Sequence, residues 1–355
     1  PQGSTVPAVE TTQRGAAAKT SITGLTTNYQ TNPLGIEAAG IRFGWQMDST
    51  VIGAKQSSYQ VQVFAEDGAQ VWDSGKVESD KSTGIACGGT VSERGTYRWQ
   101  VTVWDQAGQS YTAESSFETG VSNVQEWKEA EFICMNRSRL APIFRTEKLL
   151  EQKEIRKARL YITALGAYEA YVNGNRVGEW DESGNLVYHH MNPGYGNRNV
   201  SLGYQTYDVT PFVKDAKSAA VAVSAGAGWY NGMGNTDVSS PAVKALLMID
   251  YADGSTNTIK TNTTDWKGTL AGGITASGIY YGEDYNAIFA KELGGYTKAG
   301  YDDSAWVNAQ GSSEEEGETA SPCIVNNFAA QTASYVRLSV QESGPADNNG
   351  ENLLQ

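Results

Sequence analysis

The sequence has few of the residues that build metal centres, and no segment that could span a membrane. It contains 2 histidines and 3 cysteines in 355 residues, and Cys87, Cys134 and Cys323 form no CxxC pair. A structural zinc site needs several closely spaced Cys or His ligands, so this class of site is close to excluded. At most one disulfide can form, which leaves the redox compartment open. No apolar run reaches the length of about 18 residues that a membrane-spanning helix requires.

Positive charge is also scarce. Lys and Arg number 27 against 40 Asp and Glu, a formal net charge of −13 at pH 7. This balance argues against nucleic acid or an anionic membrane as a partner, because both require a basic surface. The first residues lack the basic and then apolar pattern of a signal peptide, which is consistent with either a processed or a cytoplasmic chain.

Glycine and aromatic residues are plentiful: 39 Gly, 9 Trp and 19 Tyr. Many turns combined with aromatic-rich strands predict an all-β protein that can present flat rings to a ligand. The length favours two or more domains over one.

The first predicted domain covers residues 21–122 and follows a tail or linker at residues 1–20. Apolar and polar residues alternate at period two over residues 59–63 and again over residues 97–103. Short strands at this spacing predict an immunoglobulin-like or fibronectin III-like sandwich, with Trp45 and Tyr97 as core aromatics.

The second predicted domain covers residues 123–312 and is also rich in strands. Asn173-Gly174 lies between two strand-like runs, a dipeptide that favours a type I′ hairpin because both residues tolerate positive φ. A second hairpin is expected around Asp253-Gly254, joining the runs 245–251 and 256–261.

Two helical segments are expected in this second domain. Thr210-Pro211 could begin a short helical turn, since proline at the first helical position loses no needed donor. Residues 147–157 are the best helix candidate by propensity, although their apolar residues form no convincing stripe. Residues 313–355 are read as an acidic loop and the start of a following, truncated β-domain.

An ordered series of motifs between about residues 25 and 310 resembles the N-terminal part of bacterial α-L-rhamnosidases, the family 78 glycoside hydrolases. No single motif is specific, but their order along the chain is. The motifs that resemble the leading fibronectin-like domain are residues 32–36, 42–46, 71–80, 97–105 and 116–120. Those that resemble the next domain are residues 158–166, 168–174, 177–178, 204–210, 228–232, 281–283, 285–287 and 301–306.

The resemblance implies a fibronectin-like sandwich followed by a jelly-roll module related to family 67 carbohydrate-binding modules. In this family the catalytic acid and base lie in an (α/α)₆ barrel further along the chain, and no long helical periodicity occurs here. The resemblance therefore implies a non-catalytic region that supports the barrel of the same protein and binds rhamnose-containing glycans, in an extracytoplasmic location in a bacterium. The segment 180–190 departs from the family pattern: it is longer and more polar than the segment that usually leads to the family's Pro-Gly-aromatic turn, here Pro193-Gly194-Tyr195.

A sugar site is indicated by residues 226–237, where glycines, aromatic rings and amides occur together. Rings stack on the C–H face of a sugar, amides bind its hydroxyls, and glycine permits close backbone approach. Trp229, Tyr230 and Asn231 are the candidates in this segment. By resemblance, Asn173 and Asn231 match positions near a calcium ion and the bound rhamnose, and Glu283 is offered as a hydroxyl acceptor.

The alternative interpretation is that Trp229 and Tyr230 are core residues and that Asn173 only forms its turn. Under this interpretation the chain is a purely structural or adhesive pair of β-sandwiches.

Calcium needs six to eight oxygen ligands, and Asn173, Asn231 and Asp237 could supply some of them, without any EF-hand spacing. His189-His190 reads as an exposed or hydrogen-bonded pair rather than a metal site.

Direct catalysis is the least favoured hypothesis. Glycoside hydrolysis needs two carboxyl groups on either side of the scissile bond, about 5 to 9.5 Å apart. The acidic pairs Asp181-Glu182, Glu283-Asp284 and Asp302-Asp303 are adjacent in sequence, so the two side chains of each pair point apart, and they read as solvated loop residues.

Overall fold

The computed structural model describes residues 19–135, 141–180, 183, 186–187, 201–228, 230, 240–278, 282–312 and 318–320. The described chain forms two compact units. Unit 1 contains the described residues up to Asn32, Ile41–Thr90 and Tyr97–Ser116. Unit 2 contains Pro33–Gly40, Val91–Thr96 and the described residues from Phe117 onward.

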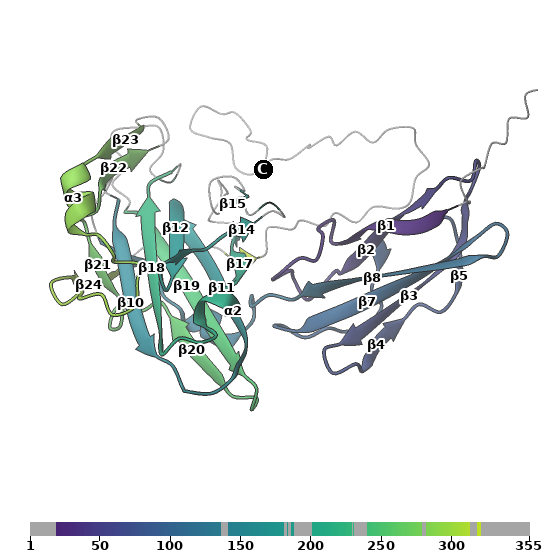
Figure 1. The fold of residues 1–355 in the computed structure, drawn as a ribbon, viewed down its shortest axis with the longest axis horizontal. Helices are drawn as coiled ribbons and strands as arrows, with labels where there is room; N and C mark the ends of the chain where they lie inside the picture. Colours follow the sequence, from purple (N-terminus) through teal and green to yellow (C-terminus); the bar gives the residue numbers. More distant parts are fainter. Residues whose placement is uncertain are drawn as a thin grey trace, which may run out of the picture. The chain divides into compact units, whose positions relative to one another are not determined.

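Unit 1 is a sandwich of two β-sheets (Figure 1). The first sheet has the order β1-β2-β6, and the second has the order β4-β3-β7-β8 with β5 also paired to β3. Their bounds are β1 Thr20–Thr27, β2 Arg42–Ser49, β3 Gln56–Ala65, β4 Gln70–Asp73, β5 Val77–Glu78, β6 Ile85–Ala86, β7 Thr96–Asp105 and β8 Ser110–Glu118.

The period-two alternation places the core of unit 1. Val61 and Val63 on β3 pair with Val101 and Trp99 on β7, and all four side chains are fully buried. The expected core aromatics Trp45 and Tyr97 are buried as well, as predicted. Because alternate side chains of a strand point to opposite faces, one face of this sheet packs into the sandwich and the other faces water.

Unit 2 is built on two larger sheets. One has the order β13-β12-β18-β10-β21-β24, and the other has the order β17-β11-β19-β9-β25 with β20 also paired to β19. The bounds of the first sheet are β10 Ile143–Leu149, β12 Ala167–Val172, β13 Asn175–Arg176, β18 Ser218–Gly226, β21 Lys267–Thr269 and β24 Val307–Asn308. Those of the second are β9 Ile133–Cys134, β11 Ile155–Leu165, β17 Gln205–Asp208, β19 Ala242–Tyr251, β20 Thr256–Lys260 and β25 Gln310–Gly311.

The two sheets of unit 2 enclose one hydrophobic core. Phe144 and Val221 from the first sheet share this core with Leu160, Ile162 and Leu247 from the second. Each such side chain contributes roughly 1.5–3 kcal/mol when fully buried. Together with unit 1, this packing confirms the predicted all-β architecture of successive antiparallel sandwiches.

The opposite face of β11 and β19 is covered too. Tyr161, Leu246 and Met248 form a second buried cluster with Trp127 of the short helix α1 (Gln125–Glu129) and with Tyr204. Every residue of β19 is therefore buried. A strand covered on both faces reads as a continuous apolar run, which explains why residues 245–249 do not alternate.

Two ion pairs hold further chain segments within unit 2. The Arg159 guanidinium donates to both carboxylate oxygens of Glu118, with Nε–Oε2 at 2.8 Å and Nη2–Oε1 at 2.6 Å. Arg94 Nη2 lies 2.7 Å from Asp250 Oδ1. Both pairs are largely buried, and bidentate geometry of the Arg159–Glu118 kind fixes orientation as well as distance.

The predicted hairpins and the helical turn are confirmed. Asn173 and Gly174 have φ of 49° and 83° between β12 and β13, as a type I′ turn requires. The second hairpin joins β19 to β20. Helix α2 (Thr210–Val213) begins with Pro211 in its first turn.

The helix prediction over residues 147–157 is wrong. These residues end β10, turn, and begin β11. Helix propensity is a weak preference, and here sheet formation overrides it. Both strands are interior members of their sheets: β10 lies between β18 and β21, and β11 lies between β17 and β19.

Three smaller strand pairs complete the described fold. They are β14 (Glu179–Trp180) with β15 (Leu186–Val187), β16 (Ser201–Gly203) with β26 (Glu318–Ala320), and β22 (Ile274–Gly278) with β23 (Gly282–Tyr285). The last pair is followed by helix α3 (Ala287–Glu292). Most of the predicted acidic loop and β-domain at 313–355 lies outside the described residues.

Candidate functional site

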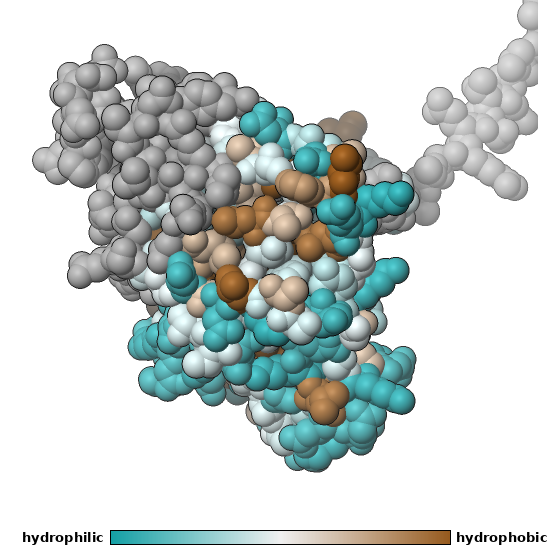
Figure 2. Space-filling model, turned by 90° about the vertical axis from the view of Figure 1, so that its left-hand side faces the viewer, coloured by the Kyte–Doolittle hydropathy of each residue, from teal (hydrophilic) through white to brown (hydrophobic). Residues whose placement is uncertain are grey.

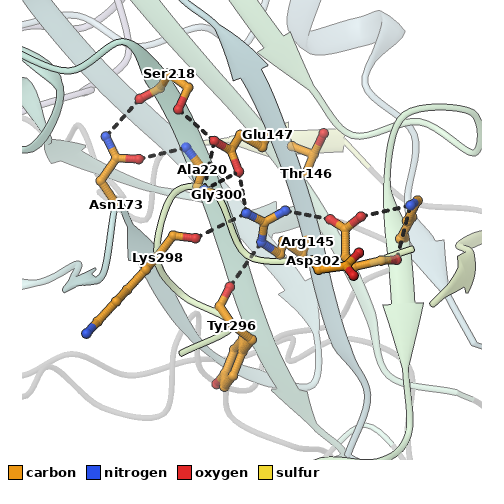
Figure 3. A network of polar contacts seen from close by, with 12 residues as sticks. Arg145, Thr146, Glu147, Asn173, Ser218, Ala220, Tyr296, Lys298, Gly300 and Asp302 are labelled. Carbon is orange, nitrogen blue, oxygen red and sulfur yellow. Dashed lines mark hydrogen bonds and ion pairs between the residues drawn. The ribbon is translucent and has the colours of Figure 1, made fainter. Parts of the chain in front are cut away.

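Asn173 holds a turn to its neighbouring elements. Its side-chain Nδ2 donates to the carbonyls of Phe212 and Ser218, each at 3.0 Å. Figure 3 shows the bond to Ser218 and the Oδ1 atom accepting from the Ala220 N–H at 2.8 Å. Both amide hydrogens are thus used by the backbone of α2 and β18. This arrangement gives Asn173 a structural role in addition to forming its turn.

The glycine-rich segment begins at the other end of β18. Gly166 and Gly228 have φ of 119° and 53°, and a Cβ on Gly166 would lie 2.2 Å from the Gly226 carbonyl oxygen. The half-buried Tyr230 then packs on a cluster that includes Leu165 and Ala242. This close approach of two backbone segments needs glycine at position 166. Trp229, Asn231 and Asp237 lie outside the described residues.

Glu283 lies near this glycine-rich end of β18. It is exposed on β23 and pairs with Ser277 on β22. A Cβ placed on Gly226 would lie 2.5 Å from the Ser277 hydroxyl oxygen, so the end of β18 and strand β22 lie close together.

The structure does not bring Asn173 together with Tyr230 and Glu283. The Asn173 end of β18 is at Ala220 and the other end is at Gly226, about 20 Å apart at roughly 3.3 Å per residue. The described residues of the expected site therefore divide into two locations at opposite ends of one strand.

An extensive polar network surrounds Arg145 on β10 (Figure 3). Only 2% of this side chain is exposed. Its guanidinium forms ion pairs with Glu147 and Asp303. It also donates to the carbonyls of Tyr296 and Lys298, both at 3.1 Å. Four hydrogen bonds thus run from the guanidinium to two carboxylates and two carbonyls.

This network fastens residues 296–303 to the outer face of the first sheet. Glu147 also accepts from the Gly300 N–H at 2.9 Å and from the Ser218 hydroxyl at 2.7 Å. Arg145 and Glu147 pair in register with Ala222 and Ala220 of β18, which are fully buried. Small alanine side chains at these positions leave room for the overlying segment.

The carboxyl groups of the network are held ionised. Burial alone would raise the pKa of Asp303, but hydrogen bonds from Lys267 and Arg145 outweigh it and lower that pKa. Burial likewise opposes ionisation of Glu147, whose pKa is lowered by hydrogen bonds from Ser218, Gly300 and Arg145. A glycosidase acid needs a raised pKa, so neither carboxyl is suited to that role.

The described residues do not form a metal centre. In the part of the chain that the structure describes, no group of three or more His, Cys, Asp or Glu side chains could hold an ion. Of the expected calcium ligands only Asn173 is described, and its Oδ1 already accepts from a backbone N–H. Asn231 and Asp237 lie outside the described residues, so the calcium site stays a prediction. The pairs His189-His190 and Asp181-Glu182 lie outside the described residues.

Sequence reasoning missed the role of Arg145. A signal was present, because arginine follows Pro-Ile-Phe in the interior of a buried strand, and a buried charge requires a partner. Its partner Asp303 was considered only as part of a solvated acidic pair, and it is 158 residues away in sequence.

Comparison with known proteins identifies the family. The family described as "Alpha-L-rhamnosidase N-terminal domain" matches residues 153–326, and that described as "Rha78A-like, N-terminal immunoglobulin domain" matches residues 22–123. A curated α-L-rhamnosidase of Formosa agariphila is 30% identical over 353 residues, 88% of this chain. The chain belongs to the N-terminal region of the α-L-rhamnosidase family. It corresponds to the non-catalytic domains of that family.

Solved rhamnosidase structures share the fold. The α-L-rhamnosidase from Dictyoglumus thermophilum matches 85% of this chain with a TM-score of 0.73 and 30% identity. That from Aspergillus terreus matches 86% with a TM-score of 0.74 and 27% identity. The chain spans about a third of these proteins: 35% of the Formosa relative and 35% of each solved chain. In the described part of this rhamnosidase region, no helix is long and apolar enough to cross a membrane.

We expect Arg145→Met to destabilise unit 2 by about 3–5 kcal/mol at pH 7, because it leaves Glu147 and Asp303 without their buried cation. Both carboxyls have lowered pKa values in the folded state. Their stabilising contribution is therefore present above the unfolded pKa of about 4 and is lost as pH falls through the folded values. The difference between wild type and variant should shrink on acidification to about pH 3.

Calorimetric melting of both proteins at pH 7 and pH 3 measures this effect. Arg176→Met is the matched control, since its ion pair with Glu169 is more exposed and contributes at most about 1 kcal/mol. Equal melting temperatures for the two variants at pH 7 would show that the Arg145 network is not important for stability.

Asn173→Ala should lower the melting temperature of unit 2, because three backbone groups lose a hydrogen-bond partner and alanine disfavours a φ of 49°. Asn173→Gly keeps the backbone conformation and should lose less. Thermal melting of both variants separates the two contributions. If both melt as the wild type does, the side chain has no structural role.

Proposed function

We propose that this region is a structural support for the catalytic domains of a larger α-L-rhamnosidase. The alignment with the Formosa enzyme carries the proposal, because 88% of this chain matches 35% of that enzyme and leaves the rest of its length for other domains. The described residues add support. The buried charges of Arg145 and Arg159 are matched by carboxylates, which is typical of a rigid scaffold.

Release of nitrophenol from an aryl α-L-rhamnoside tests this proposal. The complete rhamnosidase polypeptide should hydrolyse the substrate, and the 355-residue chain alone should not. Removing this region from the complete polypeptide should lower its melting temperature by several degrees. Hydrolysis by the isolated chain at a rate near that of the complete polypeptide would contradict a supporting role, and so would an unchanged melting temperature after removal.

A second function, binding of terminal L-rhamnose, is favoured by one observation. The glycine-rich end of β18 and the exposed Glu283 lie close together through the contact between Gly226 and Ser277. A carboxylate acceptor beside a glycine-rich backbone suits the hydroxyls of a neutral sugar. The curated relatives are rhamnosidases, which supports L-rhamnose as the sugar. The alternative remains a purely structural or adhesive pair of sandwiches.

Calorimetric titration of L-rhamnose into the 355-residue chain distinguishes these alternatives. Rhamnose binding predicts a saturable heat that Glu283→Ala removes and Asp284→Ala, the neighbouring exposed carboxylate, largely keeps. Repeating the titration with a chelator tests whether calcium takes part in binding. A chain that gives no heat with rhamnose, with or without added calcium, has a structural role only.

A further inference from the structure

Helix α3 is well formed but buries none of its own residues. Its N-cap Asn286 accepts hydrogen bonds from the N–H groups of Ile288 at 3.0 Å and Phe289 at 3.2 Å. The helix has only six residues, and helices this short are unstable in water unless they pack on something. The other two described helices do so: α1 buries Trp127 and α2 buries Val213.

One side of α3 rests on the chain. The Asn286 N–H donates to the Gly273 carbonyl at 2.7 Å, and a Cβ on Gly273 would lie 2.7 Å from the Ala290 methyl group. Leu293, the C-cap, is buried. Backbone groups, the Ala290 methyl group and one edge of the Tyr285 ring thus pack around Gly273 and fix this end of the helix.

The larger apolar residues are exposed to solvent. Exposure is 66% for Ile288, 39% for Phe289 and 67% for Tyr285 at the end of the preceding strand. Figure 2 views the side of the molecule where Figure 1 places α3, and it shows apolar residues grouped beside polar ones. Single exposed apolar residues are normal, whereas exposed apolar residues grouped on one surface are typical of interaction sites. We call Tyr285, Ile288 and Phe289 the α3 face.

Charged residues border the α3 face. Glu283 and Asp284 precede it on β23, and Lys291 and Glu292 follow it, all of them exposed. An apolar centre with a polar rim is the usual anatomy of a protein–protein interface.

The relatives of this chain are much longer than the region it matches. The described residues leave the α3 face uncovered, while 65% of the Formosa relative, the remainder after the 35% that aligns, lies outside this match. Domains of one polypeptide meet at high effective concentration, so a small apolar surface suffices to dock them. We propose that the α3 face docks onto the catalytic part of the same rhamnosidase polypeptide. This rests on the supporting role proposed above and assigns it a surface.

Amide hydrogen exchange of residues 285–293 tests the docking surface. In the complete polypeptide these amides should exchange at least about tenfold more slowly than in the 355-residue chain. The double variant Ile288→Glu, Phe289→Glu should remove that protection and lower the melting temperature of the complete polypeptide. It should lower the melting temperature of the 355-residue chain less than that of the complete polypeptide, because Ile288 is 66% and Phe289 39% exposed in the chain alone.

Ile52→Glu is the matched control, since Ile52 is fully exposed on unit 1 and should have no effect in either protein. Equal exchange in both proteins overturns the docking surface. Concentration-dependent self-association of the 355-residue chain that the double variant abolishes also overturns it, in favour of a second copy as the partner. If removing the whole region destabilises the enzyme but the double variant does not, the supporting function stands and only this surface fails.

Discussion

The fold of unit 2 depends on covering both faces of the strand pair β11–β19. One face packs against β10 and β18 through residues such as Leu160 and Leu247. The other face carries Tyr161 and Leu246, and an uncovered second face would expose large apolar side chains to water. Trp127 and Tyr204 supply that cover, so the segments before β9 and before β17 are as necessary to the core as the strands are.

The fold was predictable where the signal is local. Alternation over residues 97–103 and the dipeptide Asn173-Gly174 gave the right structures because the pleat and the turn are each determined by adjacent residues. The helix prediction at 147–157 failed for the opposite reason. Its propensity is local, but Glu147 pairs with Ala220, a partner that sequence spacing does not indicate.

The candidate site was harder to predict because residue type does not fix location. Asn173 is a good sugar or calcium ligand by chemistry, yet its amide is bonded to the backbone of α2 and β18. Arg145 reads as an isolated charge until Asp303 is brought beside it by the chain that follows α3. Both outcomes depend on contacts between residues far apart in sequence, which no local pattern in the sequence indicates.

In this region the buried polar groups stabilise the fold, whereas exposed apolar groups are available to bind a partner. Its buried charges are matched internally: Glu147 and Asp303 both have lowered pKa values, so they stabilise the sheet and are poorly suited to donating protons. Apolar surface shows the reverse pattern at α3, where Ile288 and Phe289 are exposed although the helix is capped and fixed. Saturated polar groups cannot recruit a partner without losing bonds, whereas exposed apolar groups gain free energy when they are covered. An interaction between this region and the rest of a rhamnosidase should therefore be sought at the α3 face before the charged network.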